Sequence, residues 1–94
     1  ELNTIVQGYA VDAMGNPNTG SFVWGQMIVN DSLTIWNRGQ VDQNGYYRFW
    51  ALNGVELSVW SLFNGQYSSE TFMLNATVFD DELDAYVYNY NWNN

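Results

Sequence analysis

The chain has 94 residues, 47% of them hydrophobic, and a net charge of −8 with only two basic side chains. This length fits one domain with a small core, and the scarcity of basic residues argues against nucleic acid or an anionic membrane surface as a partner. No apolar run approaches the roughly 20 residues that cross a bilayer, and the absence of cysteine excludes disulfides and zinc-thiolate sites.

Short β-favouring runs alternate with turn signals along the whole chain, and no stretch of useful length has helical periodicity. The pattern therefore predicts an all-β fold. In chain order, the predicted elements are strands 4–11, 21–29 and 33–36, a hairpin over 39–52, and strands 55–63, 66–74, 76–79 and 85–94.

The best-specified local structure is the hairpin over residues 39–52, predicted to close through a type I turn with a bulge. Asp42 accepts hydrogen bonds from the backbone that follows it, Asn44 tolerates unusual backbone angles, and Gly45 supplies a positive φ. Asp12 and Gly15 begin and end a similar Asp-x-x-Gly turn, so both aspartates are predicted to cap their own backbone. Aromatic residues follow the hairpin turn, which predicts that this arm lies mid-sheet.

The order of these turns resembles that of carboxypeptidase regulatory-like domains, which are transthyretin-like sandwiches. Residues 8–23, GYAVDAMGNPNTGSFV, are similar to the family's opening pattern of Gly, Val-Asp, Gly-Asn-Pro and Gly before a buried strand. Residues 41–59, VDQNGYYRFWALNGVELSV, resemble its second half, and the turn that begins at Asn64 fits its last turn. The resemblance covers about residues 6–73.

This resemblance implies a transthyretin-like or Ig-like β-sandwich over residues 1–79, followed by residues 80–94 as an acidic spacer and an extra C-terminal strand. It also implies a role as a spacer, stalk, adhesive module or folding unit rather than as an enzyme. Related surface sandwiches often carry a Lys-to-Asn isopeptide bond, which this chain cannot form because it contains no lysine.

Catalytic chemistry is poorly represented in the chain. The absence of His and Cys removes the Ser-His-Asp and Cys-His schemes. Glu56 and Glu70 are the remaining candidates for a paired-carboxylate mechanism, although both also fit solvent-facing strand positions. We therefore expect that the protein is not an enzyme and uses no cofactor.

Four acidic residues form the one segment whose composition suits a metal ion: Asp80, Asp81, Glu82 and Asp84. Calcium prefers several carboxylate oxygens, but the spacing lacks the central Gly and the final Glu of an EF-hand. A solvated linker is the default interpretation of this segment, and calcium binding is the alternative.

Two Asn-x-Ser/Thr sequons, at Asn30 and Asn75, lie near predicted turns and are candidate sites for N-linked glycans. The chain starts at Glu1 rather than at methionine, which favours a secreted product whose leader was removed, although a trimmed chain would look the same. We therefore expect an extracellular or cell-surface location. A surface rich in Asn, Gln, Ser and Thr also suits contacts with sugars.

The C-terminal tail, residues 85–94, alternates aromatic residues with Val and Asn. As a strand it has one aromatic face, formed by Tyr86, Tyr88, Tyr90 and Trp92. Three interpretations stay open: an ordinary last strand on its own sandwich, a strand donated to another subunit, or a platform on which sugars stack. Several other strands are apolar on both faces, which a free monomer does not require.

These features together predict a structural subunit of a self-assembling extracellular filament, linked by strand donation between copies of the chain. The alternative is a carbohydrate-binding or adhesive module of a larger secreted protein.

Overall fold

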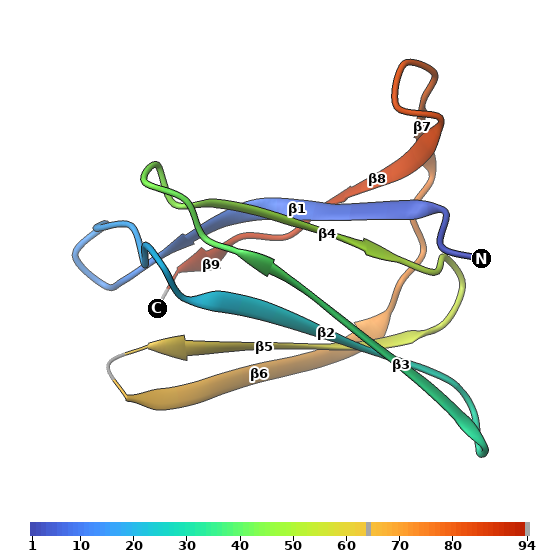
Figure 1. Ribbon diagram of the computed structural model, residues 1–94, viewed down its shortest axis with the longest axis horizontal. Helices are drawn as coiled ribbons and strands as arrows, with labels where there is room; N and C mark the ends of the chain where they lie inside the picture. The colour runs from blue at the N-terminus through green and yellow to red at the C-terminus, as the bar shows by residue number, and fades with distance from the viewer. Residues whose placement is uncertain (64, 94) are drawn as a thin grey trace.

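Two β-sheets pack face to face in the computed structural model, which describes residues 1–63 and 65–93 (Figure 1). The first sheet has the strand order β4-β1-β8-β7, with β9 also pairing to β1, and the second has the order β3-β2-β5-β6. The fold is therefore an all-β sandwich, as predicted. The described strands are β1 (Thr4–Val11), β2 (Phe22–Asn30), β3 (Leu33–Gln40), β4 (Tyr46–Ala51), β5 (Glu56–Phe63), β6 (Gln66–Met73), β7 (Val78–Asp80), β8 (Ala85–Asn89) and β9 (Trp92–Asn93).

Both predicted Asp-x-x-Gly turns are confirmed, and they have the same hydrogen bonds. Asp12 Oδ1 accepts from the backbone N–H groups of Met14 and Asn16 at 2.9 Å, and Gly15 has a φ of 84°. In the second turn, Asp42 Oδ1 accepts from the N–H groups two and four residues later, again at 2.9 Å. Gly45 there has a φ of 86°. Each carboxylate therefore caps its own backbone, as the local sequence predicts.

The prediction of a hairpin over residues 39–52 is correct for the turn but wrong for the strands on either side of it, which do not pair with each other. Its two arms belong to different sheets, because β3 pairs with β2 and β4 pairs with β1. At this corner β3 lies beside β4, where the Asn37 side chain donates a hydrogen bond to the Trp50 carbonyl at 3.0 Å. Within its sheet β4 is an edge strand rather than a central one. Residues 46–51 of one arm pair with β1, and residues 33–40 of the other arm pair with β2.

The C-terminal tail is a structural part of the sandwich. Strand β8 pairs in parallel with β1 over residues 4–7, and β9 pairs in parallel with Ala10 and Val11. A sandwich that ends at residue 79, with residues 80–94 outside it, therefore does not describe this fold. The acidic segment that follows β7 is the turn between β7 and β8, not a spacer to a separate strand.

Between β8 and β9 the tail passes close over Gly8. A Cβ atom at Gly8 would lie 2.0 Å from the Tyr90 carbonyl oxygen, so only glycine fits there. The Tyr90 carbonyl accepts a hydrogen bond from the Tyr47 hydroxyl at 2.5 Å, and the Asn91 side chain accepts one from the Tyr9 N–H at 2.9 Å. These bonds fasten the tail where the strand ladder is interrupted.

The core lies between the sheets and includes the tail. Trp92 is only 8% exposed, and the Phe72 ring stacks on both Tyr88 and Tyr90. The buried hydrophobic cluster consists of Val6, Ala10, Val23, Met27, Val41, Tyr47, Phe49, Ala51, Leu57, Val59, Leu74 and Trp92. Asn64, which begins the last predicted turn, and Asn94, the last residue of the predicted tail strand, lie outside the described residues.

Candidate ligand-binding groove

The second sheet carries aromatic side chains on the face that points away from the core. In β2, Val23 and Met27 are buried against the other sheet, so the intervening Trp24 projects outwards. The register places Trp24 directly opposite Trp60 of β5. This outer face therefore has an aromatic centre where an ordinary sandwich has polar side chains.

Four rings from four different strands line a hollow on this face: Trp24 from β2, Trp36 from β3, Trp60 from β5 and Tyr67 from β6. Its volume is about 360 Å³, which lies in the size range of small-molecule sites. Trp36 and Tyr67 are 53% and 66% exposed and form its sides, and the half-buried Trp24 and Trp60 form its floor. We call this hollow the aromatic groove.

The rings of the groove have defined positions. The Trp24 and Trp36 rings meet edge to face, with centroids 6.3 Å apart and an interplanar angle of 80°. The Nε1 atom of Trp60 is buried and makes no hydrogen bond within the described residues, so the part of this indole that lines the groove is carbon. The floor is therefore held by packing and is apolar.

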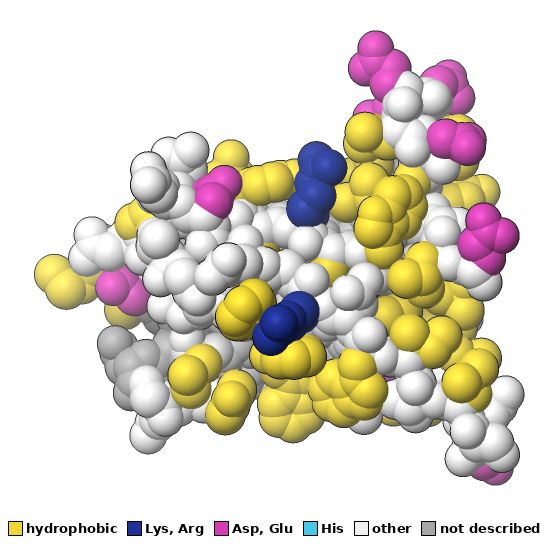
Figure 2. Space-filling view, in the orientation of Figure 1, with side chains coloured by type: hydrophobic (Ala, Val, Ile, Leu, Met, Phe, Trp, Pro, Cys, Tyr) yellow, Lys and Arg dark blue, Asp and Glu magenta, His cyan; other side chains and the backbone are white. Residues whose placement is uncertain are grey.

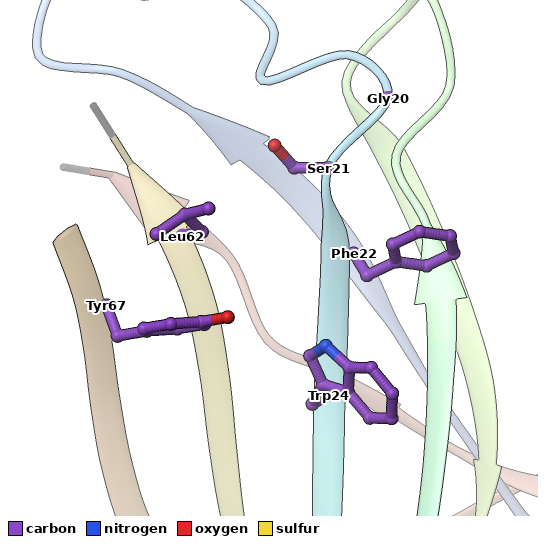
Figure 3. A pocket seen from close by; sticks show the side chains of 6 residues that line it. All are labelled: Gly20, Ser21, Phe22, Trp24, Leu62 and Tyr67. Atoms are coloured by element: carbon purple, nitrogen blue, oxygen red, sulfur yellow. The ribbon is translucent and has the colours of Figure 1, made fainter. Parts of the chain in front are cut away.

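A second cavity of about 270 Å³ adjoins the groove and shares Trp24 and Tyr67 with it. Its other lining residues are Gly20, Ser21, Phe22 and Leu62. Figure 3 shows the Tyr67 hydroxyl reaching over β5 towards Trp24, and the Trp24 indole nitrogen and the Ser21 hydroxyl at the rim. The aromatic surface thus continues into a region with hydrogen-bonding groups.

Arg38 contacts residues that line the two cavities. It lies opposite Trp24 in the β2–β3 register. The guanidinium carbon is 4.1 Å from the centroid of the Phe22 ring and 5.0 Å from that of the Trp24 ring. Figure 2 shows two basic side chains on the side of the molecule in view, and hydrophobic side chains gathered around the lower one. The groove is therefore an apolar surface with a cation at its edge.

The acidic side chains after β7 serve the turn rather than converging on one point. Asp80 Oδ1 accepts hydrogen bonds from the N–H groups of Glu82 and Leu83, at 2.9 and 3.1 Å, which caps the turn. The other three acidic side chains, Asp81, Glu82 and Asp84, are exposed. Within the described residues no group of three or more acidic, His or Cys side chains is placed to hold a metal ion.

Glu56 and Glu70 lie on opposite faces of the second sheet. Glu56 pairs with Met73 and Glu70 pairs with Val59, so the two side chains differ in their position in the alternating pattern. Glu70 accepts a short hydrogen bond from the Tyr90 hydroxyl. These two carboxylates therefore cannot flank one glycosidic bond, as the paired mechanism requires.

The two sequons are accessible. Asn30 is exposed at the end of β2, where its side chain accepts a hydrogen bond from the Ser32 N–H at 2.8 Å, and Asn75 is exposed between β6 and β7. Their glycosylation stays a prediction.

Two tyrosines, one in β4 and one in the tail, have raised pKa values. Burial is the main reason why the pKa of Tyr47 lies well above its usual value, and the neighbouring Tyr90 adds to the shift. The pKa of Tyr90 is also raised, first by burial and then by its hydrogen bond to Glu70. Both groups therefore stay neutral in the folded protein at any physiological pH.

No known family model matches this chain, and no curated protein matches its sequence. The resemblance to carboxypeptidase regulatory-like domains therefore stays a prediction. The described part of the chain contains no helix with the length and hydropathy that a membrane crossing requires.

Sequence reasoning found part of the groove. The strands that carry Trp24 and Trp60 are among those whose sequences are apolar on both faces, but this pattern did not connect the two residues to Trp36, Tyr67 or Arg38. The missed signal was the alternation in β3, where Trp36 and Arg38 fall on one face, as in a strand that extends to Gln40.

Proposed function

We propose that the protein is a carbohydrate-binding module of a secreted protein and that the aromatic groove holds an oligosaccharide. The observation that carries the proposal is the set of four rings on an outer sheet face, two of which are more than half exposed. Exposed Trp and Tyr side chains at these positions add nothing to the core, which is filled from the opposite face of the same strands. Their position is explained by a ligand that stacks on them.

The chemistry of a sugar ring suits this surface. One face of a pyranose presents C–H groups, and an aromatic ring presents a negatively charged face to them. Hydroxyl groups at the sugar's edge need hydrogen-bond partners, which the Trp24 Nε1–H, the Tyr67 hydroxyl and the Ser21 hydroxyl offer at the rim. The two adjoining cavities favour a ligand longer than one sugar ring.

The test is a binding titration with a panel of oligosaccharides, followed by intrinsic fluorescence. Three of the five tryptophans line the groove, so a stacked ligand should shift their emission. Trp36→Ala and Tyr67→Ala should each weaken binding roughly two- to tenfold, as expected for the loss of a ring contact of about 0.5–1.5 kcal/mol. Trp50→Ala is the matched control, because Trp50 is 41% exposed on the other sheet. Equal effects of all three variants would contradict the proposal.

Self-assembly into an extracellular filament is the second candidate function. The observation that favours it is the eight-residue strand β6, which within the described residues pairs on one side only, with β5. Its sequence contains neither Lys nor Pro, which often protect edge strands from pairing with another chain. A second copy that pairs along this edge would extend the sheet. Light scattering that finds a monomer at every concentration would exclude this candidate.

Strand donation by the tail would require more than an open edge. Residues 85–89 already occupy the side of β1 that faces away from β4. A donated tail would therefore have to replace the chain's own tail, as in domain swapping. Secretion and glycosylation of Asn30 or Asn75 are part of either proposal, and mass spectrometry of native material tests the glycans.

A further inference from the structure

We infer that the aromatic groove selects acidic oligosaccharides, with the Arg38 guanidinium binding the carboxylate of a uronic acid residue whose ring stacks on the tryptophans. This inference rests on the proposed function and narrows its ligand class. It starts from the contacts of Arg38, whose guanidinium lies over the Phe22 ring of the second cavity and over the Trp24 ring, which lines both cavities.

Among the residues that the structure describes, none places a carboxylate beside Arg38 on its own face of the sheet. Trp36 and Gln40 precede and follow it on the same face of β3, and Trp24 faces it from β2. Glu56 is on this face but lies beside Ile28, four residues along β2 from Trp24. That separation is roughly 13 Å along the strands. Although the chain has ten acidic residues, the Arg38 guanidinium is therefore available to pair with an anionic ligand.

The aromatic rings prepare the guanidinium for this role. Cation–π contact with Phe22 and Trp24 restrains the Arg38 side chain at the edge of the groove. A guanidinium held in this way loses little freedom when it binds a ligand, and its N–H groups match the two oxygens of a carboxylate. A uronic acid carries such a carboxylate next to a ring with an apolar face. One residue of that type therefore satisfies both the rings and the cation.

The net charge of the protein does not oppose this selection at physiological salt. The acidic turn between β7 and β8 belongs to the first sheet and lies at a corner of the molecule (Figures 1 and 2). Exposed charges separated by more than about 8 Å are largely screened at such ionic strength. The local environment of the groove therefore decides which ligand binds.

The experiment compares three oligosaccharides of equal length: an oligogalacturonate, its fully methyl-esterified form, and a neutral cello-oligosaccharide. Calorimetry measures their affinities for the unmodified protein, for Arg38→Gln and for Arg48→Gln. Arg48 is the matched control, since it is an exposed arginine that lies over the Tyr46 ring on the first sheet. The ester keeps the sugar chain of the acid but replaces each charged carboxylate with a neutral methyl ester.

We expect the unmodified protein to bind the oligogalacturonate about tenfold or more tightly than its methyl ester, the size of one charge-assisted hydrogen-bonding contact. Arg38→Gln should remove that preference while leaving ester binding unchanged, and Arg48→Gln should keep it. Equal affinity for the acid and the ester, or a preference that survives Arg38→Gln, would overturn the inference and leave the proposed function intact. Failure of all three sugars to bind would overturn both.

Discussion

Replacing Gly8 with alanine is the sharpest perturbation of this fold. The added methyl group would meet the Tyr90 carbonyl oxygen at 2.0 Å and the Asn91 side chain at 2.7 Å, whereas ordinary contacts begin at 3.4 Å. The first of these is a backbone atom, so rotation of a side chain cannot relieve the clash. Either β1 or the tail must move by more than an ångström.

Such a movement breaks the hydrogen bond that the Tyr47 hydroxyl donates to the Tyr90 carbonyl. Tyr47 is 1% exposed, so its hydroxyl would be left without a partner in a dry site at a cost of about 1–3 kcal/mol. Overpacking adds a similar amount, about 1–3 kcal/mol. The expected loss is therefore roughly 2–6 kcal/mol, a large part of the total stability of a small domain.

Urea denaturation followed by far-UV circular dichroism measures this loss. Gly15→Ala serves as a comparison, because its added methyl group meets nothing within 4 Å and only its φ of 84° is unfavourable. That variant should lose about 1 kcal/mol. In the double variant with Tyr47→Phe, the effect of Gly8→Ala should shrink, because the two changes remove the same hydrogen bond. If the Gly8→Ala and Gly15→Ala proteins had the same free energy of unfolding, the packing of the tail on β1 of its own chain would be refuted.

Three further predictions concern stability. The pKa of Tyr47 is raised in the folded protein. Above about pH 10 the unfolded chain therefore releases a proton that the folded chain keeps. The free energy of unfolding should then fall by up to about 1.4 kcal/mol per pH unit. Tyr47→Phe should reduce this slope in alkaline denaturation curves, and an unchanged slope would assign the effect to other groups. Gly45→Val should cost about 1–3 kcal/mol in thermal unfolding because Val resists a φ of 86°, and an unaltered melting temperature would contradict the assigned turn. Deletion of residues 85–94 should abolish cooperative unfolding, since it removes Trp92 from the core and exposes the edge of β1, whereas a folded truncated monomer would show that the tail is dispensable.

The turns were predictable because their causes are local. Asp12 and Asp42 bond to N–H groups two and four residues away, and Gly15 and Gly45 supply the backbone angles that complete each loop. The same is true of most strand positions, since the alternation of side chains requires only the neighbouring residues. The exception is β3, which extends to Gln40 although Gly39 and polar residues suggested an earlier end.

The pairing of the strands was not predictable from local pattern. Sequence neighbours on either side of the Asp42 turn look like a hairpin, yet each arm finds a longer partner in a different sheet. The parallel pairing of β8 with β1 joins residues more than 80 positions apart. Local propensity carries no information on such distant partners. For this reason the sequence pattern suggested that the tail pairs with another subunit. In the structure its aromatic face packs on the core of its own chain.

The amino-acid sequence by itself determined that the chain is all-β, where its capped turns lie, and that several strands are apolar on both faces. Only the tertiary structure decided which face is core, because a period of two separates the faces without saying which one meets the other sheet. As a result, Trp24 and Trp60 lie on the outer face of the second sheet. The tertiary structure also pairs β2 with β5, which are distant in sequence, so that Trp36 and Arg38 on the strand beside β2 and Tyr67 on the strand beside β5 come to one surface.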